Sequence, residues 1–150
     1  MGLAMCSAYF ERRSMRALNS CYTYFQISGD FDPREVAEIL GLKPDRWRKV
    51  GDLLPSGRRS KTSVLEYGRC EKYDVEVENM MRATIAPLLD KVELLEEIRE
   101  KYKVEFWLSV VPTVHVGEPS PTLAPPLDVI DFCHVTRTEI DIDLYVKQSE

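Results

Sequence analysis

Alternating apolar and polar residues predict four β-strands along the chain. The most regular alternation covers residues 138–146, where apolar side chains take turns with acidic and phenolic ones. Because successive side chains of a strand point to opposite faces, this stretch predicts a half-buried strand. Residues 21–28 and 103–111 alternate in the same way, and residues 63–68 form a shorter strand. In the last strand, the expected inward side chains are Ile140, Ile142, Leu144 and Val146.

Three segments between these strands predict helices. Residues 32–41 have the clearest boundaries, with Asp32 as N-cap, Pro33 in the first turn and Gly41 as a left-handed C-cap. Residues 74–102 place apolar side chains at three- and four-residue steps, and Pro87 predicts a kink or two helices within them. Residues 127–135 read as a short helix that leads to the last strand.

The order of these elements predicts the fold class. Strands alternate with helical segments, which indicates an α+β domain with a single, mostly antiparallel sheet of about four strands. We expect the helices to pack on one face, as in a ferredoxin-like sandwich. A length of 150 residues suits one domain, which we place at residues 21–148 after an N-terminal extension of residues 1–20.

A long basic segment separates the first helix from the second strand. Residues 43–61 hold seven Lys or Arg against two Asp, a local charge of +5, so that the remainder of this chain of net charge −5 carries −10. The length predicts an irregular loop, because structureless connections of more than about 12–15 residues are unusual. An aromatic side chain lies among basic ones in this loop, an arrangement that suits the binding of phosphates and nucleic-acid bases. A basic loop that only contacts solvent is the more ordinary explanation. The candidate anion-binding residues are Arg46, Trp47, Arg48, Arg58 and Arg59.

The outward sides of the predicted strands would form one polar and aromatic face. Tyr and Trp are common in contact surfaces, so this face suits a ligand, a peptide or a second copy of the chain. A solvated sheet face is the competing interpretation. The outward residues are Tyr22, Tyr24, Gln26, Trp107, Ser109, Asp141, Asp143 and Tyr145.

Catalytic and metal-binding signals are weak. Asp141 and Asp143 would lie about 7 Å apart on one strand face, a spacing that suits acid–base work or a hard cation, although solvated acids are the more ordinary explanation. His115 and His134 lack ligand-spaced partners, and no catalytic, P-loop or dinucleotide motif occurs. We therefore expect no metal and no cofactor.

Cysteine spacing, net charge and the length of apolar runs bear on the cellular compartment and on the possible partners. The four cysteines lie far apart without a C-x-x-C pair, which favours reduced thiols and a cytoplasmic protein. The acidic net charge makes general nucleic-acid binding unlikely, except through the basic loop. No apolar run approaches the roughly 20 residues of a membrane span.

Several short stretches, taken in order, resemble a bacterial family catalogued as Domain of Unknown Function 4279. They are F-Q-I-S-G-D at residues 25–30, Asp32-Pro33, L-G-L-K-P at residues 40–44, Gly51-Asp52 and E-I-D-I-D-L-Y at residues 139–145. The resemblance covers residues 22–147. It departs in the second strand, where the family commonly has a tryptophan and this chain has V-L-E-Y at residues 64–67. The resemblance implies a compact α+β protein and assigns no catalytic residues.

Two functions follow as hypotheses. The first is a non-enzymatic binding module that uses the outward sheet face and the basic loop, with a protein or a second copy as partner. The alternative is a small enzyme for an anionic substrate, in which the basic loop clamps the anion and Asp141 or Asp143 acts as base or metal ligand.

Overall fold

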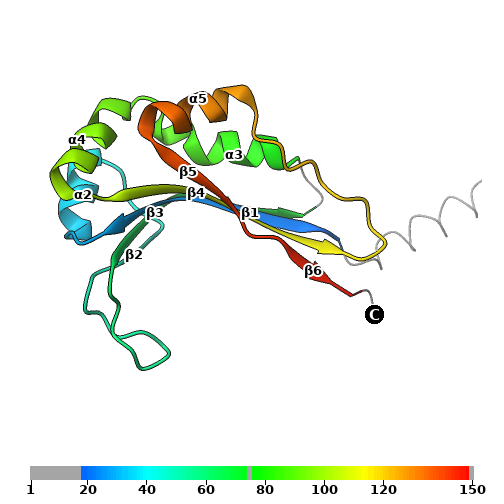
Figure 1. Cartoon of the computed structure of the whole chain (residues 1–150), viewed down its shortest axis with the longest axis horizontal. Coiled ribbons are helices and arrows are strands. Elements are labelled where there is room, and N and C mark those ends of the chain that lie inside the picture. Colours follow the sequence, from blue (N-terminus) through cyan, green and yellow to red (C-terminus); the bar gives the residue numbers. More distant parts are fainter. Residues whose placement is uncertain (1–17, 74–75, 149–150) are drawn as a thin grey trace, which may run out of the picture.

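The computed structural model of the protein describes residues 18–73 and 76–148. In this part of the chain, one open mixed sheet is covered by helices on one face and left uncovered on the other (Figure 1). The α+β class is confirmed. The strands are β1 (Ser20–Gly29), β2 (Arg46–Arg48), β3 (Ser63–Tyr73), β4 (Glu105–His115), β5 (Thr138–Ile142) and β6 (Tyr145–Lys147).

The central strand of the sheet is β1, which pairs antiparallel with both β3 and β4. The full order is β2-β3-β1-β4-β5, and β6 continues beside β4 after β5 ends. Both β5 and β6 run parallel to β4, so the sheet is mixed. The expectation of about four strands was too low, because the three-residue β2 gives no periodic signal and the predicted strand of residues 138–146 is divided into β5 and β6. A ferredoxin-like sandwich is not confirmed, because the sheet of that fold is antiparallel and has no outer parallel pair such as β4 and β5.

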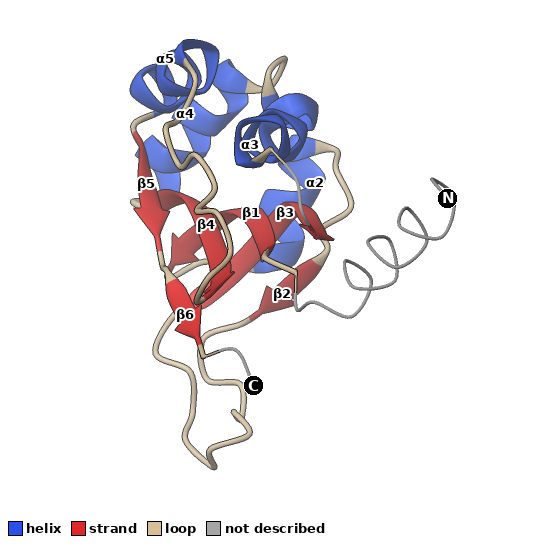
Figure 2. Cartoon of the chain, turned by 90° about the vertical axis from the view of Figure 1, so that its right-hand side faces the viewer, coloured by secondary structure: helices blue, strands red, loops and turns tan. Residues whose placement is uncertain are grey.

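Four helices of the described residues accompany the sheet. Helices α3 (Val77–Ile85), α4 (Val92–Tyr102) and α5 (Leu127–Thr136) lie over one face, as Figure 2 shows. Helix α2 (Pro33–Leu40) packs against α4 and β3 at one end of the sheet. The boundaries predicted for α2 are confirmed: the Asp32 carboxylate accepts a hydrogen bond from the Arg34 N–H, and Gly41 ends the helix at φ 66°.

The break expected near Pro87 is also confirmed. Helix α3 ends at Ile85, a short 3₁₀ turn covers Ala86–Leu88, and α4 begins at Val92. Proline favours this arrangement because it lacks the N–H that a continuous helix would need. Asp74, the first residue of the predicted helical region, lies outside the described residues.

The hydrophobic core fills the space between the sheet and the helices. Phe25 of β1 contacts both Phe106 of β4 and Phe132 of α5, with ring centroids 5.6 and 6.2 Å apart. Methionine side chains of α3 and leucines of α4 complete the core, and Met80 and Met81 are both fully buried. The inward alternation predicted for the first and third strands is therefore confirmed.

A β-bulge in β3 fixes the position of α3. Two residues of β3, Gly68 and Arg69, stand opposite the single residue Tyr24 of β1. Gly68 has φ 67°, as the first residue of this type of bulge requires. The hydroxyl of Thr84 on α3 donates to the Gly68 carbonyl at 2.8 Å and shares a 2.7 Å hydrogen bond with Thr23 of β1. The expected strand of residues 63–68 therefore continues through the bulge to Tyr73.

The expected irregular loop of residues 43–61 instead contains strand β2 and most of an ordered hairpin. After β2, backbone hydrogen bonds join Gly51 to Ser60 and Leu54 to Arg58, and a turn closes at Gly57 with φ 80°. This hairpin, residues 49–62 and here called the basic arm, projects on the uncovered side of the sheet (Figures 1 and 2). Turn residues Pro55-Ser56-Gly57 explain the reversal, since proline and glycine supply its backbone angles.

The closing strand differs from its prediction. The expected single strand of residues 138–146 is broken after Ile142 into β5 and β6, and the Asp143 N–H still donates to Val110 O at 2.9 Å. Ile140 packs against the core, but Ile142 is 40% exposed and Leu144 50% exposed. The inward role expected for Ile142, Leu144 and Val146 is thus wrong, because this strand extends past the helices at the edge of the sheet.

We expect Gly68→Ala to destabilise the protein strongly. A Cβ at this position overlaps the Thr84 carbonyl oxygen of α3 and also meets a positive φ. Gly57→Ala is the matched control, because it shares the positive φ but has open space around its Cβ. Urea unfolding should show a loss of about 1 kcal/mol for Gly57→Ala and about 3 kcal/mol or more for Gly68→Ala. Equal losses would contradict close packing at the bulge.

Candidate functional site on the open sheet face

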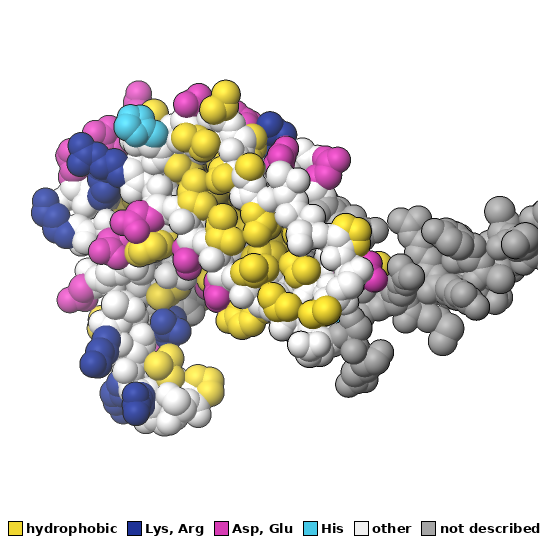
Figure 3. Space-filling model, turned by 45° about the vertical axis from the view of Figure 1, so that its right-hand side comes forward, with side chains coloured by type: hydrophobic (Ala, Val, Ile, Leu, Met, Phe, Trp, Pro, Cys, Tyr) yellow, Lys and Arg dark blue, Asp and Glu magenta, His cyan; other side chains and the backbone are white. Residues whose placement is uncertain are grey.

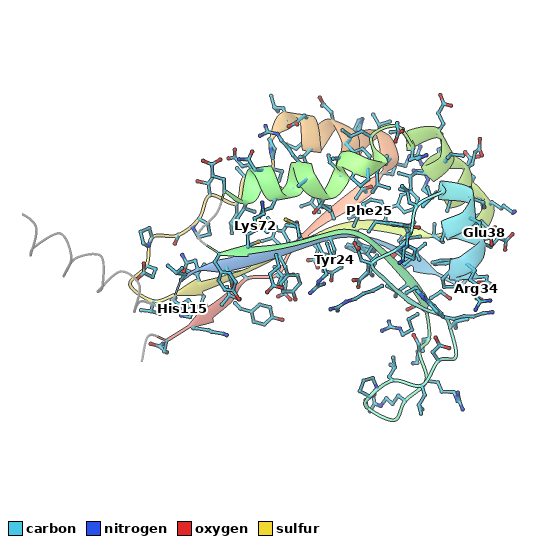
Figure 4. The ribbon with its side chains drawn as sticks, turned by 180° about the vertical axis from the view of Figure 1, so that it is seen from behind. Tyr24, Phe25, Arg34, Glu38, Lys72 and His115 are labelled. Atoms are coloured by element: carbon cyan, nitrogen blue, oxygen red, sulfur yellow. The ribbon has the colours of Figure 1, made fainter. Side chains whose placement is uncertain are left out.

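The open face is the side of the sheet that carries no helix. Pairing places Tyr24 beside Ser109 and Gln26 beside Trp107. Tyr24, Gln26 and Trp107 are half-buried and alternate with buried residues, whereas Ser109 is itself buried. Figure 4 shows Tyr24 pointing away from the helices and Phe25 pointing toward them. The predicted sharing of one face by β1 and β4 is therefore confirmed.

The centre of the open face is a stack of two tyrosines and one arginine. The Tyr22 and Tyr24 rings lie 6.1 Å apart at 13° to each other. The Arg69 guanidinium carbon lies 4.6 Å from the Tyr22 ring centroid and 5.6 Å from that of Tyr24. A cation over an aromatic face is attracted by the negative charge density of the ring. These contacts hold three half-buried side chains flat against the sheet.

Arg69 was missed by the sequence reasoning, which ended the strand at Gly68. The bulge turns Arg69 onto the open face, where its guanidinium also lies 3.9 Å from the Glu66 carboxylate. Its backbone N–H donates to Asp45 at 2.9 Å. The available signal was the glycine itself, because a glycine inside a strand pattern often marks a bulge that redirects the next side chain.

A basic border lies along β2. Arg46 and Arg48 pair with Glu66 and Val64 of β3, and antiparallel partners share a face, so both arginines belong to the open side. The Arg48 Nε is buried and has no hydrogen-bond partner. Trp47 alternates to the helix side of β2 and is 55% exposed, so the structure separates it from the two arginines.

An acidic border lies along β5. Pairing with β4 places Glu139 beside Trp107 and Asp141 beside Ser109, which brings Asp141 onto the open face as predicted. Asp143 follows the end of β5, and its carboxylate accepts a 3.0 Å hydrogen bond from the Tyr145 hydroxyl. The spacing expected for Asp141 and Asp143 assumed a continuous strand, which the break after Ile142 removes.

The hydrogen bond to Asp143 raises the pKa of Tyr145 above its ordinary value. The carboxylate stabilises the protonated phenol as acceptor, and its negative charge disfavours the phenolate. Tyr145 therefore holds its phenolic proton more tightly than a tyrosine without such a partner does.

The remaining candidates lie on the basic arm. Arg58 is exposed near its tip, and the Arg59 guanidinium donates to the Gly51 carbonyl at 2.9 Å within the arm. The arm extends beyond β2 and does not lie across Tyr24 (Figure 4). The structure therefore does not bring Arg58 and Arg59 together with Asp141.

Two of the cysteines are buried in the core. Burial raises the pKa of both Cys21 and Cys133 to about 11, which keeps these thiols protonated and poorly nucleophilic near neutral pH.

The described residues contain neither a metal-binding cluster nor a membrane-spanning helix. No group of three or more His, Cys, Asp or Glu side chains within residues 18–73 and 76–148 is arranged to hold a metal ion. The helices of the same region are all too short or too polar to cross a membrane.

The geometry defines a class of small α+β protein with one open mixed sheet, helices on one face and an aromatic, charge-bordered opposite face. Comparison of the sequence with known families gives a match over residues 19–147 to the family described as Domain of unknown function (DUF4279). The chain belongs to this family. No curated protein and no solved structure matches it significantly.

We expect Asp143→Asn to lower the pKa of Tyr145, because the substitution removes the carboxylate that holds the phenolic proton. Asp141→Asn is the matched control, since it removes the same charge without touching Tyr145. The titration can be followed by NMR of the tyrosine rings, with Tyr145→Phe to assign the signal. A pKa that is unchanged in Asp143→Asn would contradict the hydrogen bond.

Proposed function

We propose that the protein is a non-enzymatic binding module that receives a protein partner on its open sheet face. The observation that carries this proposal is the stack of Tyr22, Tyr24 and Arg69, with Trp107 on the neighbouring strand, on a face that no helix of the described residues covers. Tyr, Trp and Arg are the residue types that dominate binding energy in protein interfaces. Three such side chains packed together are more typical of a contact surface than of a sheet face that only contacts solvent.

The open face suits a partner whose surface carries both positive and negative side chains. Basic side chains border it along β2 and acidic side chains along β5, with the aromatic stack between them. Such a polarised surface orients a partner, because like charges repel in the wrong alignment. The tyrosines are also held in place before binding, which reduces the entropy cost of association.

Substitution of the aromatic centre tests this proposal. Affinity capture from the native cells with tagged wild type should retain a partner that Tyr24→Ala and Trp107→Ala lose, each weakening binding by about 30-fold, the effect of a residue worth about 2 kcal/mol. Lys101→Ala serves as control, because Lys101 lies on α4 on the covered side of the sheet. Urea unfolding confirms that each variant is folded. Capture of the same proteins by all four chains would reject the open face as the binding surface.

The alternative function, a small enzyme for an anionic substrate, requires the basic arm to close over the acidic border. Its supporting observation is that Arg46, Arg48 and Asp141 share the open face. The arm itself projects beside β2, and Arg59 is engaged with the arm's own backbone. The binding module is therefore the better supported of the two.

A ligand-dependent stability measurement separates these functions. We expect inorganic phosphate to change the Tm of wild type and of the double variant Arg58→Gln, Arg59→Gln by the same amount, since the structure shows no shared anion site for these arginines. A phosphate-dependent rise in Tm that is lost in this double variant, and altered in Asp141→Asn, would instead favour the enzyme.

A further inference from the structure

The two edges of the sheet are both open to a further strand. In the described part of the chain, β2 ends the strand order on one side and β5 ends it on the other. An edge strand presents a row of backbone N–H and C=O groups without ladder partners, which makes it a template for pairing with another chain. The sheet thus carries two templates, at opposite ends of one layer.

These two edges carry opposite charges on the same face. On the open side, β2 presents Arg46 and Arg48, whereas β5 presents Glu139 and Asp141. Two identical edges facing each other would place like charges directly opposite, which is unfavourable. The unlike edges of two molecules are complementary.

The helix side of each edge is complementary as well. Trp47 of β2 points to this side and is 55% exposed. Beside β5 there is a hollow, open to solvent, between the edge strand and helix α5, lined among others by Ile130, Cys133, Val135 and Ile140. Figure 3 shows hydrophobic side chains gathered in a band that runs from α5 toward β6. The exposed indole at one edge and this partly apolar hollow, whose lining also includes His134, Arg137 and Glu139, are of the kind that form an anchor and a pocket in protein interfaces.

Strand directions also agree. β2 runs antiparallel to β3 and therefore parallel to β1, whereas β5 runs parallel to β4 and therefore antiparallel to β1. A second copy placed beside the first in the same orientation consequently brings its β2 antiparallel to β5. When Trp47 stands opposite Ile140, Arg46 stands opposite Asp141 and Arg48 opposite Glu139. In this register, each arginine faces a carboxylate on the open side of the sheet, and Trp47 faces Ile140 on the helix side.

We propose that the protein associates with itself head to tail, through antiparallel pairing of β2 of one copy with β5 of the next. Residues Arg46 to Arg48 pair with residues Glu139 to Asp141, and the indole of Trp47 enters the hollow between α5 and β5 of the neighbour. An interface of two unlike surfaces is heterologous, so repeated pairing gives a ring or an open chain of copies. The strands are short and the ion pairs lie on the rim, so the association is reversible and weakens with salt.

Charge reversal at single exposed positions tests this pairing. Wild type should show an average mass that rises with protein concentration at low salt, by sedimentation equilibrium, and that falls at high salt. Arg46→Glu places a carboxylate opposite Asp141 of the neighbour, and Asp141→Lys places an ammonium group opposite Arg46 of the neighbour. Each variant alone should associate at least about tenfold more weakly than wild type, because an attraction becomes a repulsion. An equimolar mixture of the two variants should regain association, because positions 46 and 141 of alternating copies then again carry opposite charges.

Further variants identify the surface. Trp47→Ala should also weaken association, whereas Tyr24→Ala should leave it unchanged, because Tyr24 lies on the central strand. Glu96→Lys on α4 is the control for charge reversal away from the edges. A wild type that stays monomeric at low salt would overturn the proposal. So would a variant mixture that stays as dissociated as its components, or a Tyr24→Ala variant that dissociates while Trp47→Ala does not.

Discussion

The contact between helix α3 and the bulge of β3 is the constraint on which the rest of the structure depends. Thr84 reaches the Gly68 carbonyl and the Thr23 hydroxyl, both in the dry layer between helix and sheet. A buried hydroxyl is costly without a partner, so these three groups require one another. Only glycine fits at position 68, because a Cβ there would meet the backbone of α3. The helix layer is thereby fixed against the two strands at the middle of the sheet.

The same bulge determines the chemistry of the opposite face. One extra residue in β3 turns Arg69 away from the helices and over Tyr22 and Tyr24. Packing on the covered side and recognition on the open side are therefore linked through two adjacent residues. The basic border on β2 and the acidic border on β5 lie on either side of this centre. The protein–partner contact that we propose uses the centre, whereas self-association uses the two borders.

Local signals in the sequence predicted much of this fold. The caps of α2, the break at Pro87 and the inward alternation of β1 and β4 depend on neighbouring residues, which a sequence displays directly.

The elements that were missed depend on the rest of the molecule. Three-residue strands such as β2 form only because a longer strand lies beside them. Similarly, apolar alternation in residues 140–146 suggested burial, but the sheet extends past its helices there. On the open face, Tyr22, Tyr24, Trp107 and Asp141 followed from alternation, whereas Arg69 required knowledge of the bulge.

The central place of β1 has a consequence for how the chain folds. Its two neighbours are β3 and β4, and β4 begins only at Glu105. Pairing across such a sequence separation closes large loops, which slows folding relative to proteins built from local contacts. During synthesis, the aromatic strand β1 emerges well before β4 can cover its second edge. A chain of this topology therefore passes through states with an unpaired hydrophobic strand, in which aggregation competes with folding.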